Sequence, residues 1–129
     1  MKTITATDLR NLLNAGGVKH VDLSDNEYVL FSPSDIKRLN RVLFIISLLP
    51  YKKEARDCDD FSDFAHAVAR FWFGNCAFGR IWAEGLGTTQ GYHAANFYVT
   101  ESLEIVLYEP QNRKTYEFAP QGAAIKAFA

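Results

Sequence analysis

Three residues of this chain have types and an order that could support nucleophilic chemistry: Cys58, His93 and Glu109. A thiol becomes a strong nucleophile once a nearby imidazole takes its proton, and a carboxylate can hold that imidazole in one orientation. Cys58 directly follows Asp57, which can cap the start of a helix, and a helix N-terminus favours the thiolate form. We therefore expect a site with Cys58 as nucleophile, His93 as base and Glu109 as orienting acid.

A β-hairpin is expected to bring the imidazole and the carboxylate together. Two strands are predicted on either side of a turn at 100–102. If Val99 pairs with Leu103, the same register pairs His93 with Glu109, and directly opposed residues share one face of a sheet. An error of one residue in the register would put the two side chains on opposite faces, whereas a five-residue loop would keep them on the same face.

Several aspartates surround the predicted nucleophile, at positions 57, 59, 60 and 63. Their negative charge opposes the formation of a thiolate unless the side chains point into solvent or bind a cation. Calcium prefers several carboxylate and amide oxygens together, so calcium binding at this cluster is one hypothesis. A solvated first turn is the other, because acidic residues at a helix N-terminus are favourable without any metal.

Helical and strand periodicity predicts the elements that would position these residues. The helix that begins at Cys58 has apolar residues at steps of three and four as far as Trp72, and we expect Trp72 to lie in the core rather than form a sugar platform. The glycine-rich stretch 79–91 is expected to be irregular or loosely stranded. The earlier elements expected are a helix capped by Thr5 or Thr7 and ended by Gly16-Gly17, strands over 18–23 and 27–31, and a helix from Ser32-Pro33 to Pro50.

The composition is that of an ordinary globular protein. The chain has 129 residues, of which 48% are hydrophobic and 22% charged, and a formal net charge of −1. This length is enough for one sizeable core, so we expect a single domain over 1–129, with helices and short strands in 1–50 and the catalytic core in 51–129. The expected fold class is α+β, with the nucleophile-bearing helix packed on an antiparallel sheet.

The same composition argues against several classes of partner. A basic stripe for nucleic acid is missing, and no apolar run reaches the roughly 18 residues of a membrane span. The N-terminus does not read as a signal peptide, so a cytoplasmic location is expected, with release by lysis as an alternative. Two cysteines, Cys58 and Cys76, do not make a disulfide framework. A peptide or protein substrate is therefore expected, and no carbohydrate site is evident.

Parts of the chain resemble the papain-like cysteine protease domain at the C-terminus of the Marasmius oreades agglutinin, together with its small bacterial and phage relatives. The resemblance covers roughly 50–111 and implies that Cys58, His93 and Glu109 correspond to a catalytic triad. It also implies activation by calcium, with Asp59 and Gln111 where metal ligands would be. The sugar-binding trefoil of the agglutinin has no counterpart here, so carbohydrate binding is not implied. The matching segments are Asp57-Cys58-Asp59-Asp60-Phe61, Gly91-Tyr92-His93-Ala94-Ala95-Asn96 and Tyr108-Glu109-Pro110-Gln111.

These features predict a cysteine-dependent peptide or amide hydrolase, and two alternatives stay open. A peptidoglycan amidase or endopeptidase of NlpC/P60 type also begins a helix with Asp-Cys, although small residues usually follow its cysteine and its third residue is usually His. The other alternative is a non-enzymatic structural or binding domain that keeps the fold. It is favoured because the stretch between Arg41 and Asp57 contains no Gln or Asn, so it lacks a side-chain amide that could serve as an oxyanion donor.

Overall fold

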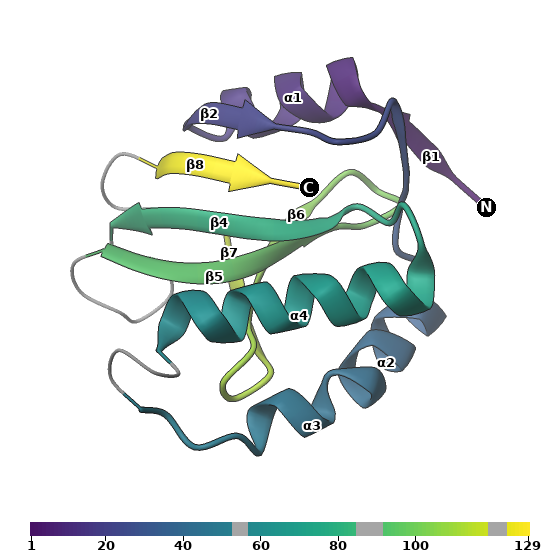
Figure 1. Ribbon diagram of the computed structural model, residues 1–129. Helices are drawn as coiled ribbons and strands as arrows, with labels where there is room; N and C mark the ends of the chain where they lie inside the picture. The colour runs from purple at the N-terminus through teal and green to yellow at the C-terminus, as the bar shows by residue number, and fades with distance from the viewer. Residues whose placement is uncertain (53–56, 85–91, 119–123) are drawn as a thin grey trace.

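A computed structural model describes residues 1–52, 57–84, 92–118 and 124–129 of the chain (Figure 1). The predicted α+β class is confirmed, because helices and strands are mixed along the described chain. In chain order the elements are β1 (Thr3–Thr5), α1 (Ala6–Ala15), β2 (Val18–Asp22), β3 (Glu27–Val29), α2 (Pro33–Val42), α3 (Phe44–Ser47), α4 (Cys58–Phe73), β4 (Phe78–Glu84), β5 (Tyr92–Val99), β6 (Ile105–Glu109), β7 (Lys114–Glu117) and β8 (Ala124–Phe128).

Most of the described strands form one six-stranded sheet with the order β2-β8-β4-β5-β6-β7. Its neighbouring strands are antiparallel except for β2 and β8, which are parallel. The expected antiparallel sheet is therefore corrected at one edge, where a strand from the first part of the chain lies beside the last one. Strands β1 and β3 form a separate antiparallel pair.

Helices cover both faces of the six-stranded sheet, which gives three layers (Figure 1). Helix α1 packs on one face through Leu9 and Leu13, which share a buried cluster with Phe97 of β5. Helices α2, α3 and α4 cover the other face, where the next residue of β5, Tyr98, belongs to a second buried cluster. This division follows from the alternation of side chains along a strand.

Local signals in the sequence account for the starts of the helices. Thr5 Oγ1 accepts a hydrogen bond from the N–H of Asp8 at 3.1 Å, and Ser32 forms a reciprocal capping box with Asp35. The single helix expected from Ser32 to Pro50 is divided at Leu43, where the N–H of Ile46 bonds to the Leu43 carbonyl three residues back. No helix among the described residues is long and apolar enough to cross a membrane.

Candidate functional site

Helix α4 begins where the sequence predicts, with Asp57 before it and Cys58 as its first residue. The N–H of Asp57 donates to Asp60 Oδ2 at 3.2 Å, so the acidic residues close the first turn on themselves. Cys58 is a free, half-buried cysteine. The thiol therefore lies at the positive end of a helix of sixteen residues.

The imidazole and carboxylate predicted to meet do so. His93 Nε2 lies 2.5 Å from Glu109 Oε1, and only 10% and 14% of the two side chains are exposed. The predicted register is wrong by two residues, because Val99 pairs with Ile105 and Asn96 with Tyr108. A shift of two keeps both side chains on one face, and the longer reach of a diagonal pair closes the gap.

Two buried polar residues fix α4 against β5 close to this pair. Ser62 Oγ donates to the Ala95 carbonyl at 2.8 Å, and Asn96 Nδ2 donates to the Ser62 carbonyl at 3.0 Å. Cys58 is one helical turn before Ser62, and His93 is two strand residues before Ala95, each a step of about 6 Å. The thiol and the imidazole thus lie toward the same end of the α4–β5 contact, although no hydrogen bond among the described residues joins them.

Three carboxylates at the start of α4 come close enough to share a cation. Ligand oxygens of Asp57, Asp59 and Asp60 all lie within 4.8 Å of one another. Asp63 is not part of the group, because it forms an ion pair with Arg80. Gln111 is placed beside Glu109, since its backbone N–H donates to Glu109 Oε2 at 3.3 Å.

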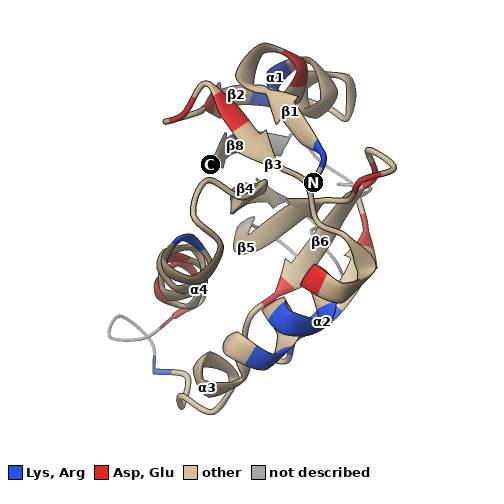
Figure 2. Cartoon of the chain, turned by 90° about the vertical axis from the view of Figure 1, so that its right-hand side faces the viewer, with Lys and Arg blue, Asp and Glu red and all other residues tan. Residues whose placement is uncertain are grey.

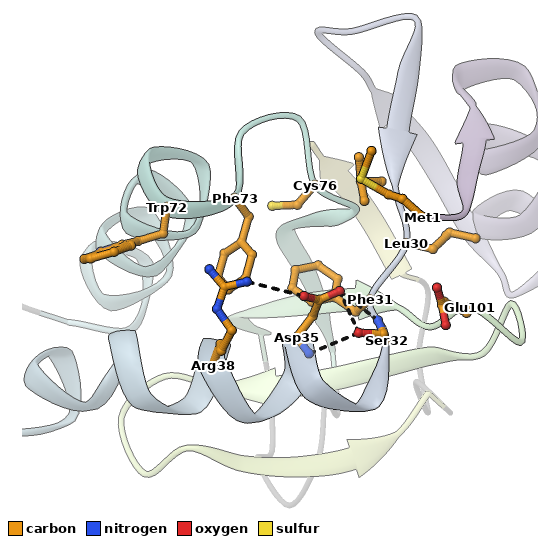
Figure 3. A pocket seen from close by; sticks show the side chains of 11 residues that line it. Met1, Leu30, Phe31, Ser32, Asp35, Arg38, Trp72, Phe73, Cys76 and Glu101 are labelled. Atoms are coloured by element: carbon orange, nitrogen blue, oxygen red, sulfur yellow. Dashed lines mark hydrogen bonds and ion pairs between the residues drawn. The ribbon is translucent and has the colours of Figure 1, made fainter.

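The described part of the chain also has a cavity of about 460 Å³ at the opposite end of α4 (Figure 3). Its walls come from the N-terminus, the segment after β3, α2, the end of α4 and the turn after β5. The lining residues are Met1, Val29, Leu30, Phe31, Ser32, Asp35, Arg38, Trp72, Phe73, Cys76 and Glu101. No sequence motif indicates this site, because its residues come from four separate stretches of the chain.

Charged groups and an aromatic ring meet at the rim of the cavity. The Arg38 guanidinium lies 5.0 Å from the centre of the Phe73 ring and 3.6 Å from Asp35 Oδ1. Asp35 Oδ2 accepts hydrogen bonds from the backbone and the hydroxyl of Ser32 at 3.1 and 2.8 Å. Arg38 is therefore oriented by the ring and by Asp35, while 56% of its side chain stays exposed for a ligand. Figure 2 shows basic residues along α2, which carries this arginine.

The position of Trp72 corrects the expectation that it lies in the core. Trp72 is 57% exposed, and its neighbour Phe71 is 85% exposed. Helical spacing predicted a single buried stripe, but the buried face of α4 is formed by the smaller set Phe61, Ser62, Ala65 and Ala69. Trp72 lies outside this set and forms one wall of the cavity.

The second cysteine forms part of the inner wall of the cavity. Cys76 is only 2% exposed, and its Sγ lies 3.8 Å from the Ala69 carbonyl. Burial raises the pKa of the Cys76 thiol to about 11, so it stays protonated at neutral pH. In this environment Cys76 acts as a small buried hydrophobe.

Two solved structures are similar to this chain in fold. The structure titled "PSL1a-E64 complex" has a TM-score of 0.83 and 21% sequence identity, and the match covers 98% of this chain and 51% of that one. The Polyporus squamosus lectin, crystallised with the human-type influenza-binding epitope Neu5Acα2-6Galβ1-4GlcNAc, has a TM-score of 0.80 at 21% identity, with 98% and 49% covered. The chain thus spans about half the length of the solved chains it matches. No protein-family model matches the sequence, and no curated protein does.

These comparisons contradict the functional predictions from sequence. One of the similar structures is that of a lectin bound to a sialylated glycan epitope, so we correct three assignments: the papain-like protease family of agglutinin type, cysteine-dependent hydrolysis with its hydrolase and thiol protease classes, and a peptide substrate without a carbohydrate site. The NlpC/P60 alternative is corrected with them. Cys, His and Glu in this order form only a short motif, and the contact between two of them does not by itself show that the site performs a reaction. The findings agree better with the alternative of a non-enzymatic binding domain.

Proposed function

We propose that this chain is a non-enzymatic binding domain for carbohydrate, with the cavity at the end of α4 as its site. The observation that carries the proposal is the combination of an exposed indole, Trp72, with the guanidinium of Arg38 and the carboxylates of Asp35 and Glu101 around one hollow. Its volume of about 460 Å³ lies within the roughly 300–1,000 Å³ of small-molecule sites.

Each of these groups matches one property of a sugar. A pyranose ring has an apolar face of C–H groups that can stack on the flat indole of Trp72. Sugar hydroxyls donate to carboxylates, and Glu101 and Asp35 supply them at the wall. A guanidinium binds a carboxylate through two parallel hydrogen bonds, so Arg38 is suited to an acidic sugar. The structure of the Polyporus squamosus lectin has a bound trisaccharide that ends in Neu5Ac, so this trisaccharide is the first ligand to test.

The test is a calorimetric titration with Neu5Acα2-6Galβ1-4GlcNAc, and with Galβ1-4GlcNAc, on the wild type and matched variants. We expect Trp72→Ala to weaken binding of both glycans by about tenfold, the loss of one aromatic contact. Phe71→Ala is the control, because Phe71 is an even more exposed ring that does not line the cavity. Arg38→Gln should weaken only the acidic glycan, with Arg41→Gln, on the same helix, as its control. Failure of both glycans to bind the wild type would contradict the proposal, as would equal losses in Trp72→Ala and Phe71→Ala.

A second proposal concerns a site at the end of α4 that carries the Cys58 thiol, and the contact between His93 and Glu109 supports it. We propose that Cys58, His93 and Glu109 form one polar site, in which Cys58 is the nucleophile, His93 is the base and Glu109 is the orienting acid. We also propose that this part of the fold is papain-like, because the helix that begins with Cys58 packs on the sheet that carries His93. E64, the compound named with one similar structure, is the ligand to test here.

Alkylation by iodoacetamide distinguishes an activated thiol from an ordinary one. We expect Cys58 to react about tenfold faster than the buried Cys76, and His93→Ala to remove the difference. E64 should bind the wild type and fail to bind Cys58→Ala. Equal slow reaction of both cysteines, together with no E64 binding, would mean that the His93–Glu109 contact is structural.

Calcium is a third proposal, with Asp59 and its neighbours Asp57 and Asp60 as carboxylate ligands and Gln111 as a further ligand. Oxygen donors on one helical turn fit a hard cation, and the ion would offset the repulsion among three carboxylates. We expect calcium to raise the melting temperature of the wild type and not that of Asp59→Asn. An equal shift in both proteins would contradict this assignment.

A further inference from the structure

We propose that the groove between α1 and the β6–β7 pair binds an extended, basic peptide segment of another protein. The groove consists of two hollows of about 810 and 380 Å³ that share Leu12 and Leu103 in their walls, so they adjoin. The larger one is lined by the end of α1 and by β6 and β7, and the smaller one by β1 and the start of α1. This surface shares no lining residue with the cavity at the end of α4.

Leu103 is held at the centre of the groove in an unfavourable conformation. Its φ is 65°, in the left-handed region that is sterically unfavourable for a leucine. Its N–H donates to the Thr100 carbonyl at 2.9 Å, and the next N–H, of Glu104, donates to Thr100 Oγ1 at 3.1 Å. These bonds close the turn and leave the leucine side chain 50% exposed. A strained turn that exposes an apolar side chain between two hollows is suited to contact with a partner.

The rest of the groove is apolar in its walls and acidic in its charge. Ile105, Tyr116 and Phe118 supply partly buried apolar surface. Among the described residues, the charged ones that line the two hollows are Asp8, Glu104 and Glu117, all of them exposed and none of them basic. A ligand with alternating apolar and basic side chains complements this surface, because Lys and Arg can lay their apolar stems along it and pair with the carboxylates.

The strand order favours an extended ligand. Strand β7 is the last strand on its side of the sheet among the described strands, and it borders the larger hollow. A terminal strand can pair through its backbone with an added strand, while the neighbouring pockets select alternate side chains. The peptide class follows from this combination of backbone edge, apolar pockets and acidic rim.

The test selects peptides from a displayed library of random decapeptides on the folded chain and measures the selected peptides by fluorescence anisotropy. We expect them to be enriched in Lys and Arg with apolar residues between them. Leu103→Gly should weaken their binding by about tenfold, the effect of losing a central apolar anchor. This variant also relieves the positive φ, so it should keep or raise the melting temperature. Leu48→Ala, at a leucine that is 63% exposed elsewhere, is the matched control and should change nothing.

Charge reversal provides an independent arm of the test. Glu104→Lys with Glu117→Lys should abolish binding, while Glu27→Lys, on the exposed part of β3, should leave it unchanged. Binding should also weaken as salt increases. The proposal is overturned if no peptide is selected, if the selected peptides are not basic, or if Leu103→Gly and the double reversal leave their affinity unchanged. A selected set that binds the Leu48 region instead would assign peptide binding to α3.

Discussion

Asn96 holds helix α4 against two strands, and its replacement should be among the most damaging single changes in the core. Asn96 is fully buried, and its Nδ2 donates to the carbonyls of Ser62 and Gly79 at 3.0 and 3.1 Å. Because Ser62 lies on α4, the bond from Asn96 to the Ser62 carbonyl also fixes the position of α4 relative to β5. Asn96→Ala removes both hydrogen bonds and the volume of the amide.

The cost of this change follows from the contacts that are lost. Each buried carbonyl that loses its donor costs about 1–3 kcal/mol, and the unfilled space adds to that. Asn96 Oδ1 has no partner among the described residues, so its removal returns a small part of the cost. We therefore expect Asn96→Ala to lower the free energy of unfolding by about 3–4 kcal/mol. Ser62→Ala, which removes one hydrogen bond to Ala95, should lower it by about 1–2 kcal/mol.

The assay is urea denaturation followed by tryptophan fluorescence and far-ultraviolet circular dichroism. Asn112→Ala is the control, because its side chain is exposed and accepts one bond from the N–H of Lys114 at 2.9 Å. We expect the control to lower stability by about 0.5 kcal/mol, within the range of ordinary surface substitutions. A loss below 1 kcal/mol in Asn96→Ala would show that α4 is held in position without the two hydrogen bonds from Asn96.

Three further predictions concern stability. Gly79→Ala should lower the free energy of unfolding by at least about 3 kcal/mol in urea denaturation, because its Cβ would overlap the Phe128 carbonyl and lie 2.8 Å from the Phe97 ring; a loss under 1 kcal/mol would contradict this packing. Burial, followed by the Arg80 charge, lowers the pKa of His66 to about 4, so below pH 6.5 the unfolded chain takes up a proton that the folded one does not. Stability should therefore fall by about 1–2 kcal/mol between pH 6.5 and 4 after allowance for solvent screening, and His66→Gln should flatten this part of a pH–stability curve. Tyr108→Phe should leave the melting temperature unchanged or raise it, because the hydroxyl is buried without a partner among the described residues, and a fall of several degrees would reveal a bond to it.

The sequence was sufficient for features that depend on local signals. The N-cap at Asp57, the start of α4 at Cys58 and the strand 92–99 are found as predicted. The contact between His93 and Glu109 was also predictable, since parity along a strand survives a register shift of two residues. The exact register was not, because it depends on how many residues form the turn after Val99, and both three and five fit the apolar pattern.

Features that depend on distant segments could not be derived in this way. The parallel pairing of β2 with β8 joins a strand from the first part of the chain to the last described strand, and the sequence of neither strand indicates its partner. Trp72 fits a helical stripe, but the burial of each position depends on the elements packed against it, and Trp72 is 57% exposed. The cavity at the end of α4 combines four separate stretches of the chain, so no sequence motif indicates it. The functional prediction failed for a related reason: a short motif indicates what a cluster of residues could do, but it does not determine the function of the fold that carries it, and a solved structure with a similar fold is that of a lectin.

The most direct test of carbohydrate binding is an NMR titration of the ¹⁵N-labelled chain with Neu5Acα2-6Galβ1-4GlcNAc. We expect saturable shifts at the indole N–H of Trp72 and at the amides of Ser32, Arg38 and Glu101, which line the cavity. The amides around Cys58 and His93 should stay in place. No shift at saturating glycan, or shifts confined to the thiol end of α4, would show that the cavity does not bind this glycan.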